Sequence, residues 1–511
     1  MKQRAKYFFN CLLLFFFLSL PMNLLADIRN DQDIKIKIPK SKGSIYELLN
    51  RVSVQSGYMF IYDSQLIDND KIVRIPSGEY TLQEAIHIIT GNNQLNIRIV
   101  GNHILLYMPA KDAITPPLKG KPEEKGYFAL EGSLRDRITG EPIIYGTISV
   151  SNFSYGTVSN QNGDFKLTLP DSLLQSYVKF SHVGYITREI GASLLADQHI
   201  IFYLDQKIIP LQEIVVRIVD PLRILREMML KRSFNYSRNP VYHTAFYREG
   251  VEYKKSISLS EAVLKIYKSG YMSSAGSEQV KLLKMRRMTD TDEKDTLVAK
   301  IKSSVNSCLL LDLVKTPPDF LLPQTHEQYN YSHTDITTIE DRRVYVISFV
   351  QNEMITEPLY SGELYIDAEN YSLLKASFEI NPDYVRKTSD DFIIKKSKNF
   401  EITPEKVVYE VSYKPLNGIY YINHIRGDLN FKVRKKRRLF SSDLHVWFEM
   451  VICKTDTADV RRFSSDERIS TRDIFSETTF TYDKDFWGNF NVILPEDKLK
   501  ELIEKYEFNQ R

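Results

Sequence analysis

Cysteine is scarce in this chain of 511 residues, which contains three. Cys11 lies in an N-terminal segment that we expect to be removed, so Cys308 and Cys453 remain to form at most one disulfide. This excludes the dense disulfide framework that stabilises small secreted domains. The fold must rest on apolar cores instead, and a content of 43% hydrophobic and 12% aromatic residues is sufficient to build them.

An excess of charge of either sign is missing as well. The chain has 68 Lys and Arg against 65 Asp and Glu, and Lys2, Arg4 and Lys6 lie in the first 26 residues, which contain no acidic residue. Without this segment the two charges balance. General binding to nucleic acid needs a surface that neutralises phosphates, so we expect no nucleic-acid partner.

Long uncharged apolar runs are absent after residue 26, and we expect no helical membrane span there. Residues 1–26 begin with a basic stretch, which is followed by the apolar residues 8–20, by Pro21 and by a small residue, Ala26. This layout is typical of a cleavable signal peptide, residues 1–26, cut between Ala26 and Asp27. The alternative is an uncleaved N-terminal anchor. Export with few cysteines favours a bacterial periplasm, in association with the outer membrane.

Residues 33–108 are predicted to form a small α+β domain with the order β-α-β-β-α-β-β. Ser44 with Glu47, and Thr81 with Glu84, have the spacing of a capping box at the start of a helix. Apolar residues at helical spacing follow each cap, and short alternating runs between the helices indicate strands.

The segments of this block resemble the secretin and TonB N-terminus short domain (STN). Leu82, Ala85 and Ile86 fit the family's Leu-x-x-Ala-Leu phrase, whereas residues 91–93 read Gly-Asn-Asn where the family has Gly-Thr-Gly. The resemblance implies a small periplasmic module that binds an envelope protein partner.

An alternating aromatic run in the same block is the candidate partner surface. It consists of Tyr58, Phe60 and Tyr62, which would share one face of a strand. The alternative is that this face is simply buried in the domain core.

Residues 109–126 contain four prolines and alternating charge, which predicts a linker. Residues 127–216 have short alternating segments separated by turn signals, which predicts an all-β sandwich. The turns at 139–142, 162–165 and 183–185 make this block resemble the carboxypeptidase-like regulatory domain, a transthyretin-like β-sandwich.

The peptidase chemistry suggested by that family name is not expected. A zinc carboxypeptidase needs a His and a Glu three residues apart, and none of the nine histidines has a Glu at that position. Nucleophile elbows, phosphate loops and dinucleotide fingerprints are also absent from the sequence. We therefore expect no catalytic residues, no metal and no cofactor. A dispersed Ser-His-Asp site remains open, because such triads are defined by geometry.

Residues 220–511 are predicted to form a large, curved antiparallel sheet with helices at its ends. The paired strands 362–367 and 373–380 resemble the sheet of lipoprotein carriers (LolA-like), which implies a lipid or peptide ligand. Other phrases resemble uncharacterised envelope proteins. We expect the following apolar strand residues to lie under helices or a ligand: Tyr365, Leu374, Phe378, Val411 and Tyr413.

One basic run is a candidate patch for an acidic ligand such as lipid headgroups or phosphates. It consists of Arg434, Lys435, Lys436, Arg437 and Arg438. The alternative is an exposed hairpin turn with a solvated charge run.

Together these patterns predict a multidomain protein of α+β and all-β parts. The expected function is that of a non-enzymatic binding protein of the periplasm or outer membrane, whose modules mediate contacts in envelope transport or signalling. The alternatives are a small outer-membrane β-barrel of about 12 strands formed by the last block, and an envelope hydrolase with an unrecognised site.

Overall fold

The computed structural model describes most of the chain between residues 35 and 503. The described residues are 35–56, 58–62, 67, 71–93, 95–100, 103–107, 126–196, 198–207, 220–254, 256–274, 276–290, 299–301, 304–396, 400–437, 439–471, 487–497, 499–501 and 503. The signal segment with Ala26 and Asp27, and the linker up to residue 125, lie outside them.

Two compact units make up the chain. The first comprises Met1–Tyr62 and Leu66–Ala113, and the second comprises Asp63–Gln65 and Ile114–Arg511. Each is described by itself.

The first unit contains both expected helices and all five expected strands, together with two further short strands. Its elements are β1 Lys35–Ile38, β2 Ser41–Ser44, α2 Ile45–Ser56, β3 Met59–Tyr62, β4 Ile72–Ile75, β5 Gly78–Thr81, α3 Leu82–Thr90, β6 Asn96–Val100 and β7 His103–Tyr107. The pairs β1–β5 and β2–β4 are antiparallel, and a third sheet has the order β3-β7-β6. The additional strands β2 and β5 are the four-residue segments that lead directly into the helices.

Local chemistry explains where these helices begin. Thr81 accepts a hydrogen bond from the Glu84 backbone and the Glu84 carboxylate accepts one from the Thr81 backbone, which is the expected capping box. Ser44 and Glu47 exchange the same two bonds, each at 3.2 Å. The apolar helix faces then pack into one core with residues of β1, β4 and β7.

The second unit begins with a β-sandwich. Its strands are β8 Tyr127–Asp136, β9 Thr147–Val150, β10 Gly156–Val158, β11 Asp164–Pro170, β12 Tyr177–Ser181, β13 Arg188–Gly191 and β14 His199–Leu204. One sheet has the order β11-β8-β14 and the other β10-β9-β12-β13. The rings of Phe165, Phe180 and Phe202 pack together between the two sheets, with centroids 4.2–6.2 Å apart.

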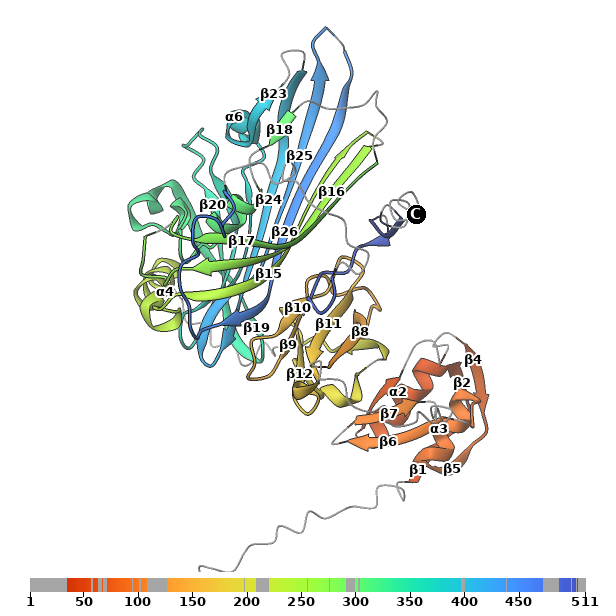
Figure 1. The fold of residues 1–511 in the computed structure, drawn as a ribbon. Coiled ribbons are helices and arrows are strands. Elements are labelled where there is room, and N and C mark those ends of the chain that lie inside the picture. Colours follow the sequence, from red (N-terminus) through yellow and green to blue (C-terminus); the bar gives the residue numbers. More distant parts are fainter. Residues whose placement is uncertain are drawn as a thin grey trace, which may run out of the picture. The chain divides into compact units, whose positions relative to one another are not determined.

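A single antiparallel sheet of ten strands dominates the same unit (Figure 1). Its order is β17-β16-β15-β26-β25-β24-β22-β21-β20-β19. The strands are β15 Val241–Tyr253, β16 Ser256–Lys268, β17 Gln279–Asp290, β19 Tyr329–Ile339, β20 Arg342–Gln351, β21 Tyr360–Asp367, β22 Leu373–Ile380, β24 Phe400–Leu416, β25 Ile419–Lys435 and β26 Ser441–Asp456. A short pair, β18 Ala299–Ile301 and β23 Ile393–Lys396, lies outside this sheet.

One face of the large sheet is covered by segments of the chain itself. The covering elements are α4 Pro221–Asn235, α5 Ser304–Leu310, η6 Asp319–Leu321, η8 Val385–Thr388 and α6 Ser389–Phe392. Phe320 of η6 stacks on Phe349 at 4.4 Å between ring centroids and contacts Phe378 at 5.2 Å.

The apolar strand residues singled out from the sequence belong to this covered face. Leu374, Phe378, Val411 and Tyr413 are buried, and Tyr365 is half-buried against the same core. The sequence did not decide whether helices or a ligand would cover these residues. In the structure, the chain's own helices and loops cover them.

The antiparallel sheet and the sandwich confirm the expected fold class, but three of the ten strands of the large sheet were not predicted from the sequence. These are β17, β19 and β26, and β26 lies at the centre of the sheet between β15 and β25. The expected C-terminal helix falls mostly outside the described residues. Cys308 and Cys453 are buried free thiols, so the single disulfide that the sequence allowed is not formed. Among the described residues, no helix has the length and apolarity needed to cross a membrane.

Candidate functional site

The residues proposed from the sequence as a partner surface lie in the first unit. Phe60 and Tyr62 belong to β3, and Tyr58 directly precedes it. Tyr58 and Phe60 are half-buried and pack against the core of the unit, whereas the Tyr62 side chain is outside the described residues. Because β3 lies at the edge of its three-stranded sheet, its backbone is placed for pairing with an added strand.

The basic run lies in the second unit, at the end of β25 and in the turn that follows. Arg434, Lys435, Lys436 and Arg437 are exposed, and Arg438 is outside the described residues. Arg434 forms an exposed ion pair with Glu401 at 2.5 Å. The structure therefore places this run in a hairpin turn, in a different unit from the aromatic run.

A buried row of alternating charges crosses five adjacent strands, and it was not anticipated from the sequence. We call it the charge ladder. In the order of the strands β17, β16, β15, β26 and β25 it consists of Arg286, Glu261, Arg248, Glu449 and Arg426. Each residue is the register partner of the next, so antiparallel pairing itself brings their side chains together on one face.

The ladder is held by short contacts. The distances are 2.7 Å from Arg286 Nε to Glu261 Oε2, 2.6 Å from Arg248 Nη2 to Glu261 Oε1, 3.2 Å from Arg248 Nη1 to Glu449 Oε1 and 3.3 Å from Arg426 Nη1 to Glu449 Oε2. All five side chains are buried. Each carboxylate thus lies between two guanidinium groups, which offsets the cost of removing it from water.

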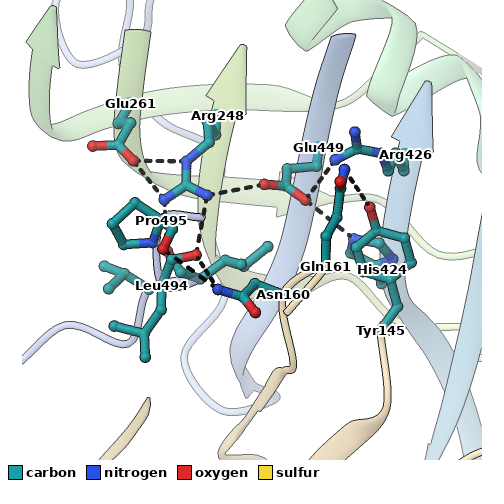
Figure 2. A network of polar contacts seen from close by, with 12 residues as sticks. Tyr145, Asn160, Gln161, Arg248, Glu261, His424, Arg426, Glu449, Leu494 and Pro495 are labelled. Carbon is teal, nitrogen blue, oxygen red and sulfur yellow. Dashed lines mark hydrogen bonds and ion pairs between the residues drawn. The ribbon is translucent and has the colours of Figure 1, made fainter. Parts of the chain in front are cut away.

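The sandwich and the C-terminal segment cover the ladder (Figure 2). Arg248 donates to the Ile493 carbonyl at 2.6 Å, and Asn160 of the sandwich donates to the Leu494 carbonyl at 3.2 Å. The Arg426 guanidinium lies 5.4 Å from the ring centroid of the sandwich residue Tyr145. The ladder therefore connects three parts of the chain that are far apart in the sequence.

An apolar contact continues this junction beside the charges. Val158 of the sandwich packs with Phe246 and Val451 of the large sheet and with Val492 and Ile493 of the C-terminal segment. The side-chain amide of Asn491 also binds the backbone of β11, accepting from Thr168 N–H and donating to the Thr168 carbonyl.

The flanking arginines keep the ladder carboxylates ionised. Burial alone would raise the pKa of Glu449, but the nearby His424 ring, Arg426 and Arg248 outweigh burial and lower it to about 2. Burial would also raise the pKa of Glu261, but the neighbouring Arg248 and Arg286 outweigh this effect, so the pKa lies below its ordinary value. Carboxylates held in this state accept hydrogen bonds but do not readily take up a proton from a substrate.

Two histidines of the large sheet have polar partners that a hydrolytic site would also use. His445 lies 3.1 Å from Asp428, but the same carboxylate is held by Arg426 at 2.7 Å. His243 is buried and bonds Thr455 at 3.0 Å. In the part of the chain that the structure describes, no cluster of three or more His, Cys, Asp or Glu side chains is arranged to hold a metal ion.

Comparisons with known proteins identify one block. Residues 130–216 match the family model of the CarboxypepD_reg-like domain, so the sandwich is similar to that family. No curated protein matches the chain.

Three solved structures share a distant likeness. The "putative outer membrane lipoprotein-sorting protein domain" of Vibrio parahaemolyticus is 9% identical with a TM-score of 0.20, over 47% of this chain and 95% of its own. A DUF1329 family protein of Desulfovibrio piger ATCC 29098 is 8% identical with a TM-score of 0.19, over 48% and 96%. Lipovitellin, solved for its lipid–protein interactions, is 8% identical with a TM-score of 0.23, over 45% and 26%. At such TM-scores these structures carry no argument about function.

Proposed function

We propose that this chain is a non-enzymatic binding protein of the bacterial envelope. The observation that carries this proposal is the charge ladder. Its buried acidic and basic groups bind one another, the sandwich and the C-terminal segment. Groups used in this way stabilise a rigid body and do not face a substrate.

The covered face of the large sheet supports a role in contacts rather than in enclosing a lipid. Phe320 and its neighbours occupy the apolar face that a carrier would leave open for its cargo. We therefore infer that the large sheet binds a peptide or protein at its surface and does not enclose a lipid.

The first unit supplies the surface for a protein partner. Its resemblance to an STN domain and the edge position of β3 both support binding of an envelope protein by strand addition. The signal-like N-terminus supports export, so the proposed binding would take place in the periplasm.

Photocrosslinking in living cells tests the partner. Benzoylphenylalanine at Tyr58, beside the β3 edge, should give one discrete crosslinked species containing an envelope protein. The same probe at Tyr177, an exposed aromatic residue on β12 of the sandwich, should not give that species. Identical crosslinks at both positions, or none at Tyr58, would contradict binding through β3.

Purified chain tests the absence of catalysis and of a lipid cargo. We expect no turnover of peptide or glycan substrates and no stoichiometric lipid in organic extracts analysed by mass spectrometry. Turnover would favour the hydrolase alternative, and a bound lipid would favour a carrier.

A further inference from the structure

The turn between β25 and β26 extends beyond β15, the strand beside β26, whereas β24 accompanies β25 on the other side as far as Lys435. We call the described residues 434–437, 439 and 440 the hairpin tip. β15 pairs with β26 only as far as Leu444, and β26 continues three residues further to Ser441. At about 3.4 Å per residue this extension is about 10 Å. Figure 1 shows the hairpin reaching beyond the end of β16.

Positive charge remains in excess at the hairpin tip. The nearby carboxylates of Glu401 and Asp443 pair with Arg434 and Lys432. The next three residues, 435–437, are exposed Lys, Lys and Arg, and within the described residues they form no ion pair. Arg438 adds a further basic residue in the sequence.

Two large apolar side chains follow the basic residues directly. Leu439 is 93% exposed and Phe440 is 88% exposed. Exposed apolar residues also occur on α4, but there the Arg238 guanidinium lies 5.3 Å from the ring centroid of Phe234. The hairpin tip thus combines exposed apolar side chains with adjacent basic side chains that have no acidic partner among the described residues.

We propose that the hairpin tip docks this protein on a membrane surface containing anionic phospholipids. The basic side chains would bind the phosphate headgroups, and Leu439 and Phe440 would enter the boundary between headgroups and acyl chains. Basic residues near an anionic surface and apolar side chains in its interface contribute attraction additively. This contact is separate from the proposed partner site on β3 and does not depend on it.

Co-sedimentation of the purified exported chain with vesicles tests the contact. Binding is expected to phosphatidylglycerol–phosphatidylethanolamine vesicles and not to phosphatidylcholine vesicles. Replacing Lys435, Lys436 and Arg437 by Gln should weaken it on the order of 100-fold. Replacing Leu439 and Phe440 by Ser should weaken it at least about tenfold.

A matched pair of exposed apolar residues provides the control. Leu230→Ser with Phe234→Ser on α4 should leave vesicle binding unchanged. All variants alter exposed positions, so their thermal unfolding should match that of the parent chain. Equal binding to both vesicle types, or equal loss in the α4 variant, would overturn the proposal.

A fluorescent probe separates insertion from simple anion binding. Phe440→Trp should show a blue shift with phosphatidylglycerol vesicles and quenching by doxyl-labelled lipid, whereas Tyr177→Trp in the sandwich should show neither. Binding that millimolar inorganic phosphate abolishes, without a blue shift in Phe440→Trp, would mean recognition of the anion alone and would refute docking. The crosslink at Tyr58 is unaffected by either result.

Discussion

At the scale of single residues, the charge ladder has no signature in the sequence. Arg248 and Glu449 are 201 positions apart and become neighbours only through the pairing of β15 with β26. Charged residues inside alternating strands usually indicate a solvated face. Here the sandwich covers that face, so periodicity alone could not predict the buried environment of these residues.

Removing one ladder charge should be costly because its partners stay buried. Glu449→Gln leaves Arg248 and Arg426 without full compensation and should lower the free energy of unfolding by about 3–5 kcal/mol. Urea titration measures this change. The exposed Glu401→Gln variant is the control and should cost at most about 1 kcal/mol. Equal small effects would mean that the ladder contributes little to stability.

Acid sensitivity should arise from His243. Burial lowers the pKa of its ring to about 3, so below pH 6.5 the unfolded chain takes up a proton that the folded chain excludes. The contribution of His243 to the free energy of unfolding is therefore complete above pH 6.5. It falls on acidification, by about 2 kcal/mol between pH 7 and pH 5. Urea titrations at these two pH values measure it. His243→Gln should reduce the pH slope, and an unchanged slope would exclude this histidine as its source.

At the scale of elements, the sequence was informative where the causes are local. The capping residues Ser44 and Thr81 placed both helices of the first unit, and turn residues placed the hairpin between β21 and β22. The strand β26 was missed because both of its faces are buried, which removes the alternation by which a strand is recognised. Its central position follows from long-range pairing, on which local spacing carries no information.

The C-terminal segment should act as a connector between the sandwich and the large sheet. Asn491→Ala would leave the buried Thr168 N–H and carbonyl without partners, and it should lower the free energy of unfolding by about 2–3 kcal/mol. Gln161→Ala, an exposed position at the same junction, is the matched control and should change it by less than about 0.5 kcal/mol. The comparison requires urea titration of both variants, and equal costs would contradict a connecting role.

At the scale of the whole molecule, the division into two units predicts which sites of proteolysis separate the protein into independent fragments. A protease site engineered into residues 112–118 should release two folded fragments, because this segment joins the two units. A site engineered into 210–217 should leave the sandwich bound to the large sheet through Asn160, Tyr145 and the C-terminal segment. Gel filtration after cleavage measures both. A sandwich that elutes alone after the second cut would show that these contacts are too weak to hold it.

The central position of β26 also determines the order in which the sheet is completed. β15 to β17 form one meander and β19 to β25 form another, and each can pair within itself as the chain emerges. The two meanders are joined only when β26, residues 441–456, inserts between β15 and β25. Until then the inner edges of both half-sheets are unpaired strand edges, which are prone to aggregate. Folding should therefore be slow and should depend on chaperones, because contacts between residues about 200 positions apart complete the sheet last.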